Sequence, residues 1–264
     1  TGGNTQVSLR WNSVTGADNY TIYKGMRGTS SSEVTNYVTT LAGTAESFGS
    51  TDGTGTDAKF SSPLGITTDG TNLYVTEFGN NRIRKIVIAT GVVTTIAGNA
   101  NACSYGCSGS TDATGTSARF NMPYGITTDG TNLYVADQHN HTIRKIVISS
   151  GVVTTLAGTA GSTGNTNGTG TSARFYYPTG VITDGTNLYV ADLLNSKIRK
   201  IVISTGVVTT LAEGGGLYRP NSITSDGTNL YVTESQKHRI SKIVISTGVV
   251  TIFAGSSSSG NSNG

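Results

Sequence analysis

One ten-residue stretch occurs four times in this chain of 264 residues. It reads TDGTNLYVTE, TDGTNLYVAD, TDGTNLYVAD and SDGTNLYVTE, and its aspartates are Asp69, Asp129, Asp184 and Asp226. The intervals between these aspartates are 60, 55 and 42 residues. Repeats with periods of a few tens of residues are typical of solenoids and propellers, so the chain is predicted to be a repeat protein.

The first unit, PLGITTDGTNLYVTEFGNNRIRKIVIATGVVTTIAG, is predicted to contain four short strands and no helix. Its Asp-Gly pair favours a tight turn, because the aspartate accepts backbone hydrogen bonds and the glycine tolerates positive φ. All four prolines of the chain stand just before the first strand of a unit, where a missing N–H does not interrupt a ladder. We expect antiparallel strands over residues 66–68, 73–76, 82–88 and 92–97 of this unit.

A single unit is too small to be stable alone, because its few apolar side chains do not offset the entropy lost on ordering it. Strands such as 73–75 are apolar on both faces, which suits a sheet packed between two neighbours. The predicted fold is therefore all-β: a β-propeller of four-stranded antiparallel blades, with four clear blades and an irregular N-terminal blade.

The repeated motifs resemble those of NHL repeats. They are ARF or AKF, then P-x-G-I, LYVAD, N-x-x-I-R-K-I and G-x-V-T-T-x-A-G, and they match over residues 39 to 255. The resemblance implies a β-propeller, commonly of six blades. It also implies a scaffold for protein, glycan or nucleic-acid binding, or in some members a lyase or hydrolase.

The N-terminal residues 1–38 depart from the repeat that fills residues 39–264. The segment VSLRWNSVTGADNYTIYKG resembles half of a fibronectin type III module, with Trp11 as its core tryptophan. These strands are either an irregular first blade or half a sandwich with an open edge for another chain. The direct passage into the repeat favours the irregular blade. The tail GSSSSGNSNG resembles the start of another link, so we expect part of a longer protein or a subunit that continues into a neighbour.

Composition and charge limit the partners. The 18 basic and 15 acidic residues are spread along the chain, so no electrostatic footprint for nucleic acid is present in the sequence. No apolar run is long enough to span a bilayer, and no signal peptide is recognisable. Cys103 and Cys107 are predicted to form a disulfide, with free thiols as the alternative. A disulfide favours an oxidising compartment, and we expect a bacterial extracellular or cell-surface protein.

The links between units vary in length and are expected on the same side as the loop between the second and third strands of each unit. Length variation on one side suggests a face that meets partners. A carboxylate recurs after each second strand and either binds a ligand or cation or accepts N–H bonds in its own loop. Basic residues of the links are expected to pair with these carboxylates. The candidate ligand-binding face is Lys59, Glu77, Arg119, Asp137, His139, Arg174, Asp192, Arg219 and Glu234.

Two histidines, His139 and His141, stand two residues apart on one loop. A catalytic zinc ion needs three protein ligands, and the third would have to be His238 from a distant unit. We therefore expect no metal, no cofactor and no catalytic residues.

The leading hypothesis is a non-enzymatic extracellular or cell-surface propeller for adhesion, assembly or binding of a protein or carbohydrate. A first alternative is a subunit of a surface filament or layer that self-associates through its incomplete N-terminal strands, which would make it a homo-oligomer. A second alternative is a lyase or hydrolase with a metal-assisted site. RNA binding is the least supported class.

Overall fold

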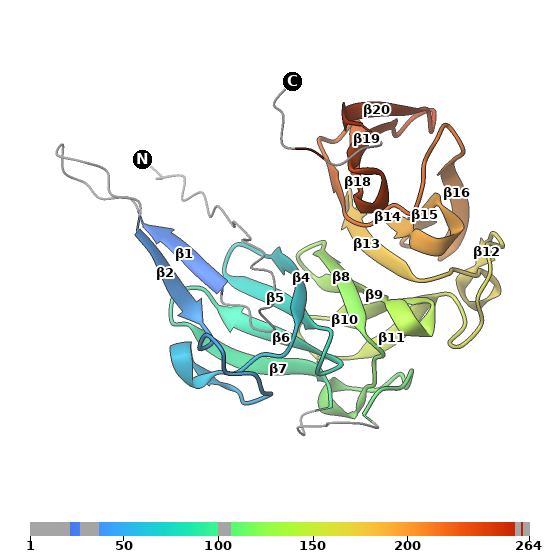
Figure 1. The fold of residues 1–264 in the computed structure, drawn as a ribbon. Coiled ribbons are helices and arrows are strands. Elements are labelled where there is room, and N and C mark those ends of the chain that lie inside the picture. The colour runs from blue at the N-terminus through green and yellow to red at the C-terminus, as the bar shows by residue number, and fades with distance from the viewer. Residues whose placement is uncertain (1–21, 27–36, 100–106, 257–259, 261–264) are drawn as a thin grey trace, which may run out of the picture.

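The computed structural model describes residues 22–26, 37–99, 107–256 and 260, and within them the chain forms five β-sheets joined by links with short 3-10 turns. The sheets follow one another in an open arc from the N-terminal to the C-terminal end (Figure 1). No helix in the described part of the chain is long and apolar enough to cross a membrane. The predicted all-β propeller fold, with four-stranded antiparallel blades, is confirmed.

The first sheet is a two-stranded half-blade, and four blades follow it in sequence order. The half-blade contains β1 (Ile22–Met26) and β2 (Tyr37–Ala42). Blade 1 contains β3 (Gly53–Thr54), β4 (Pro63–Thr68), β5 (Asn72–Glu77), β6 (Arg82–Val87) and β7 (Val92–Gly98). Blade 2 contains β8 (Pro123–Thr128), β9 (Asn132–Asp137), β10 (Thr142–Val147) and β11 (Val153–Ala157).

Blades 3 and 4 complete the arc. Blade 3 contains β12 (Gly168–Thr169), β13 (Pro178–Thr183), β14 (Asn187–Asp192), β15 (Lys197–Val202) and β16 (Val207–Glu213). Blade 4 contains β17 (Ile223–Ser225), β18 (Asn229–Glu234), β19 (Arg239–Val244) and β20 (Val250–Gly255). The 3-10 turns are η1 (Gly55–Asp57), η2 (Gly115–Ser117), η3 (Gln138–Asn140), η4 (Gly170–Ser172), η5 (Leu193–Asn195) and η6 (Ser235–Lys237).

The Asp-Gly turn is specified by its own side chains. In blade 2, Asp129 Oδ1 accepts hydrogen bonds from the backbone N–H groups of Thr131 (2.8 Å) and Asn132 (2.6 Å). The hydroxyl of Tyr134 donates to Asp129 Oδ2 at 2.8 Å, which ties the turn to the second strand. Gly130 adopts a φ of 89°, a region that glycine enters without strain. The same bonds recur at Asp69, Asp184 and Asp226, so the predicted turn is confirmed in every blade.

These turn aspartates predict a loss of stability in acid. Partial burial alone would raise the pKa of Asp69, but hydrogen bonds from Asn72, Thr71 and Tyr74 lower it from 3.8 to about 2. A carboxyl whose pKa is lower in the folded state stabilises the fold above its unfolded pKa, and that stabilisation disappears as pH falls through the folded pKa. We therefore expect the melting temperature, followed by circular dichroism, to fall between pH 3.8 and about 2. An Asp69→Asn variant should lose less in this window, and an unchanged profile would contradict the assignment.

The hydrophobic core lies between successive blades rather than within one. Ile83 and Ala97 of blade 1 pack with Phe120 and Val135 of the next repeat in one buried cluster. Each blade thus has a back face toward the following blade and a front face toward the preceding one. Successive blades therefore stack on one another, as expected for units that are too small to be stable alone. Equivalent clusters join Ala42 to blade 1, Ile143 and Ala157 to blade 3, and Ile198 and Ala212 to blade 4.

The long links cover the outer edges of the blades, which the repeat pattern did not indicate. β3 pairs with β7 and β12 pairs with β16, so each adds a short fifth strand outside the fourth. The end of each link then returns beside the loop after the second strand, as in the 3.0 Å bond from Phe78 N–H to the Ser62 carbonyl. The prediction that the links lie on the same side as the loop between the second and third strands is therefore correct for the ends of the links. The middle of each of these two links thus covers part of a sheet edge that would otherwise be open.

The half-blade repeats the geometry of the outer half of a blade. β1 pairs with β2 as β6 pairs with β7, with Ile22 opposite Ala42 where Ile83 is opposite Ala97. A register shift follows Ile22 and Ile83 alike. β1 lies within the predicted 1–38 segment and β2 crosses its end, an arrangement in keeping with an irregular first blade. Trp11 lies outside the described residues, so the fibronectin-like resemblance stays a prediction.

Candidate functional site

The four recurring carboxylates are buried inside their blades. Asp137 ends β9 and is fully buried. It accepts hydrogen bonds from Asn121 N–H (2.7 Å), Asn140 Nδ2 (2.7 Å) and Arg144 Nη1 (2.8 Å). Of the two roles considered from the sequence, this geometry fits the structural one, in which the carboxylate accepts hydrogen bonds from its own loop and link. Glu77, Asp192 and Glu234 are likewise fully buried and hold the corresponding loops.

An arginine on the third strand is the partner of these carboxylates. Arg144 on β10 is buried, pairs with Asp137, and also binds Asp112 of the link at 2.6 Å. Its guanidinium lies 5.0 Å from the centre of the Phe120 ring. Burial raises the pKa of Asp137 to about 6, against the opposing effects of Arg144 and the other donors. Arg84 and Arg199 occupy the same position in blades 1 and 3.

The expected pairing of link cations with the carboxylates is wrong. Arg119 donates to the carbonyls of Thr116 and Ala118, and Arg174 binds the equivalent carbonyls of blade 3. Arg219 donates to Gln236 Oε1 at 3.1 Å. Lys59 forms no ion pair with any described residue. The correct partners come from the recurring IRKI motif, whose arginine sits seven residues after the carboxylate and points to the same face.

Blade 4 lacks this arrangement. Ser241 replaces the arginine and donates to Glu234, which also pairs with Arg239 at 2.9 Å. The short link before blade 4 supplies no counterpart of Asp112. Ile252 stands where Thr155 of blade 2 binds Asp112 through its N–H and hydroxyl. The last blade thus lacks the buried arginine, the link residue that this arginine binds, and the threonine of the fourth strand that binds the same link residue.

A chain of aromatic rings, here called the aromatic row, lies where the loops after the second strands meet the starts of the inner strands. Phe78 contacts both Tyr124 (6.5 Å between ring centroids) and His139 (6.4 Å). His139 lies 4.7 Å from Tyr177, and Tyr177 lies 5.5 Å from Tyr176. The row therefore spans blades 1, 2 and 3. Its members are Phe78, Tyr124, His139, His141, Tyr176 and Tyr177.

Of the predicted site residues, only His139 belongs to the row. Sequence reasoning missed the other rings, although aromatic residues beside the recurring prolines of an otherwise uniform repeat are a usable signal. Tyr176 is 37% exposed, and Phe78, Tyr124, His139 and Tyr177 are partly exposed. The row thus offers ring surface to a partner while its members support one another edge to face.

The surroundings of the two histidines of the row favour the neutral imidazole by lowering both pKa values. Burial lowers the pKa of His139. Burial and the nearby His139 lower the pKa of His141. His141 Nδ1 accepts a hydrogen bond from Tyr177 N–H at 3.3 Å and so joins blade 2 to blade 3. Among the described residues, no group of three or more His, Cys, Asp or Glu side chains is placed to share a metal ion.

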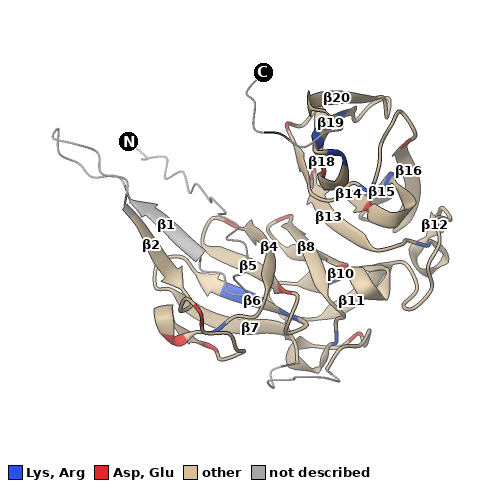
Figure 2. Ribbon diagram, viewed as in Figure 1, with Lys and Arg blue, Asp and Glu red and all other residues tan. Residues whose placement is uncertain are grey.

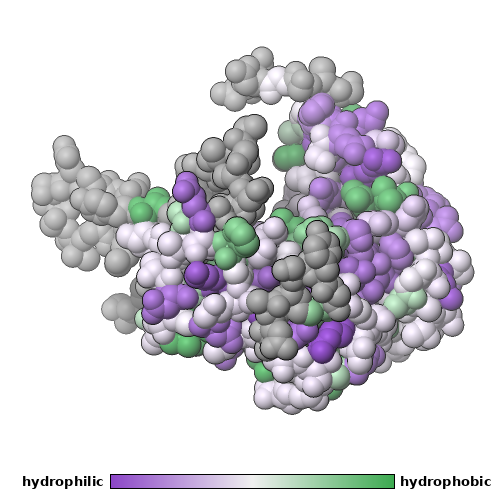
Figure 3. Space-filling view, turned by 60° about the horizontal axis from the view of Figure 1, so that its bottom comes forward, coloured by the Kyte–Doolittle hydropathy of each residue, from purple (hydrophilic) through white to green (hydrophobic). Residues whose placement is uncertain are grey.

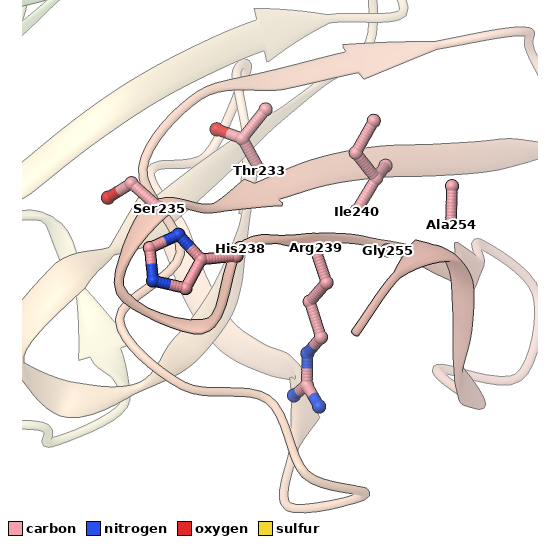
Figure 4. A pocket seen from close by; sticks show the side chains of 7 residues that line it. All are labelled: Thr233, Ser235, His238, Arg239, Ile240, Ala254 and Gly255. Carbon is pink, nitrogen blue, oxygen red and sulfur yellow. The ribbon is translucent and has the colours of Figure 1, made fainter. Parts of the chain in front are cut away.

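Two further features lie apart from the row. A pocket of about 420 Å³ is lined entirely by blade 4, with Ser235 and His238 from one loop and Thr233, Arg239, Ile240, Ala254 and Gly255 from its strands (Figure 4). Cys107 Sγ lies 3.0 Å from Asn99 Nδ2. Cys103 lies outside the described residues, so the disulfide stays a prediction. Basic and acidic residues are scattered over all the blades (Figure 2).

The chain is similar to curated NHL proteins over part of its length. It is 29% identical over 163 residues to human (Homo sapiens) NHL repeat-containing protein 2, a match covering 58% of this chain and 22% of that protein. The Bos taurus protein of the same name is 38% identical over 110 residues, covering 40% of this chain and 14% of the relative. The chain thus spans less than a quarter of the length of these relatives. No protein-family model matches it.

Solved structures share the fold at low sequence identity. An auxiliary nutrient binding protein from Bacteroides thetaiotaomicron superposes with a TM-score of 0.57 at 15% identity, covering 89% of this chain and 56% of that one. A chain of the nidogen/laminin complex gives 0.51 at 15% identity, covering 90% and 91%. These likenesses concern the fold alone. Taken with the repeats, the blade geometry and the curated relatives, they show that the chain is a β-propeller whose repeats are similar to those of NHL proteins.

Proposed function

We propose that the chain is an extracellular or cell-surface binding propeller that holds a protein partner on the aromatic row. The observation that carries this proposal is the continuity of the row across three blades on one side of the molecule. Tyrosine, phenylalanine and histidine rings fixed by their neighbours present large contact areas at little cost in conformational entropy.

The side chains around the row also suit a protein interface. Tyr218 occupies in blade 4 the position of Tyr176 and is 38% exposed. The centre of its ring lies 5.5 Å from Arg219 Cζ and 5.1 Å from Lys237 Nζ. Aromatic residues and arginine are enriched in the energetically dominant parts of protein interfaces. One similar structure comes from the nidogen/laminin complex, and others from nutrient binding proteins, which supports a binding role in general. Among the described residues, no group of three or more His, Cys, Asp or Glu side chains is placed to hold the metal ion of a metal-assisted lyase or hydrolase.

Removing rings from the row is expected to weaken partner binding about 5- to 30-fold for each ring, since a central interface tyrosine contributes roughly 1–2 kcal/mol. The measurement is surface plasmon resonance of the full chain and of Tyr176→Ala and Tyr177→Ala against arrays of purified surface proteins and of glycans. Phe48→Ala is the matched control, because Phe48 is 73% exposed but lies outside the row.

Three results decide the matter. Protein binding that both tyrosine variants weaken and the Phe48 variant leaves unchanged supports the proposal. Binding only to glycans, with the same dependence on the row, would replace the protein partner by a carbohydrate. Binding that is indifferent to the row would overturn the site.

A further inference from the structure

The back face of blade 4 is exposed, although every other back face is covered. Ile240 on β19 is 37% exposed, whereas its counterparts Ile83, Ile143 and Ile198 are fully buried. Phe253 on β20 is 59% exposed and contacts only Tyr231 among the described rings, at 5.1 Å. The counterparts of exposed Ala254 are Ala97, Ala157 and Ala212, which are at most 4% exposed.

The other end of the arc carries the opposite kind of face. Val38 on β2 is 67% exposed. Its register counterparts on the front faces of blades 1 to 3, Val93, Val153 and Val208, are each 1% exposed because the preceding blade covers them. Among the described residues, nothing covers the back face of blade 4 or the front face of the half-blade. The two lie at opposite ends of an open arc and do not meet within the molecule (Figure 1).

The inner strand of blade 4 limits what can cover its back face. A Cβ added at Gly65, Gly125 or Gly180 would lie 2.4, 2.3 or 2.7 Å from a backbone carbonyl oxygen of the next blade, so a complete following blade demands glycine there. Blade 4 has Ser222 at this position. A serine Cβ excludes the close approach of another inner strand. Whatever packs on the back face of blade 4 must therefore leave its inner strand free and contact only the outer half of the blade, around β19 and β20.

A two-stranded half-blade fits this requirement. β1 and β2 have the register of the outer two strands of a blade, and the described part of their sheet has no inner strand. We propose that the half-blade of a second copy packs against Ile240, Phe253 and Ala254 of the first, with Val38 facing them. The pocket of Figure 4 then forms the inner margin of the contact, beside Thr233 and His238.

The contact joins two different faces, so it is heterologous, and an open assembly of any length keeps one free front face and one free back face at its two ends. Such contacts generate a filament, or a ring when the rotation closes. Hydrophobic surface elsewhere on the side seen in Figure 3 occurs in small patches among hydrophilic residues. The proposal is independent of the aromatic row.

Sedimentation velocity of the full chain at rising concentration is expected to show species larger than dimers, visible as chains by electron microscopy. Ile240→Asp and Val38→Asp should each abolish them, because each variant keeps only one working face. Mixing the two variants should yield a one-to-one complex that grows no further, since the remaining faces still fit each other. Val152→Asp is the matched control, because Val152 is as exposed as Ile240, at 37%, but lies on blade 2.

Circular dichroism and melting temperature show whether each variant is folded. Failure of the mixture to form the one-to-one complex would overturn the proposal. So would a monomer at concentrations up to about 1 mM, where even a millimolar Kd would be detected. A symmetric dimer of either single variant would assign the exposed faces to another contact and exclude the heterologous one.

Discussion

Replacing Arg144 with methionine is expected to lower the free energy of unfolding by about 3–5 kcal/mol, because removing one member of a buried ion pair leaves the other charge uncompensated. Asp137 would remain fully buried, with only its neutral donors Asn121 and Asn140. Asp112 would also lose its tie to the third strand, so the link before blade 2 should loosen. The measurement is the urea unfolding transition, with its midpoint and slope.

The matched control is Arg119→Met in the same repeat. Arg119 donates only to nearby carbonyls of its own turn and is partly exposed, so its loss should cost less than about 1 kcal/mol. Equal costs for the two variants would show that the ion pair does not hold the blade. A double variant, Arg144→Met with Asp137→Leu, should recover part of the stability, since an apolar pair leaves no buried charge.

Replacing Gly125 with alanine is expected to cost about 3 kcal/mol, the upper end of the usual range for overpacking, because the added Cβ enters a contact between two backbones. It would lie 2.3 Å from the Thr179 carbonyl oxygen of blade 3 and 3.1 Å from Gly180 Cα. Neither atom belongs to a flexible side chain, so a whole strand has to move. The melting temperature of the variant measures the effect.

Ser222→Ala is the control for this prediction. Ser222 occupies the same position in blade 4 and is exposed, so trimming its hydroxyl should change the melting temperature little. A mild effect of Gly125→Ala would mean that inner strands can separate without loss. That result would also remove the steric reason for a half-blade as the cover of blade 4.

Much of the fold could be predicted because its instructions are local. The Asp129-Gly130 turn, the proline before each inner strand and the continuous apolar run of β9 lie within a few residues of the structure they specify. The need for stacking followed from the small apolar area of one unit. The short fifth strands β3 and β12 could not be predicted, since two residues such as Gly53 and Thr54 carry no periodic pattern.

The candidate site could be predicted from the sequence less well than the fold. The recurrence of Asp137 and its equivalents correctly raised the possibility of a structural role, but their partners were assigned to Arg119 rather than Arg144. Both arginines recur at fixed positions, and the choice depends on burial: one arginine points into the blade and the other into its own turn. Tyr124 meets Phe78, and Tyr177 meets His139, only through packing of successive blades, which local patterns do not describe.

The reuse of one interface between all blades has a consequence for how such a gene can change length. Unequal recombination between the near-identical segments that encode the turns would insert or delete a whole repeat from the middle, and the new neighbours would meet through the same glycine, phenylalanine and isoleucine positions as before. The terminal repeat is outside this exchange. Ser222 and Ser241 replace the glycine and the arginine there, so an exchange that involved blade 4 would bring together a different set of contacts.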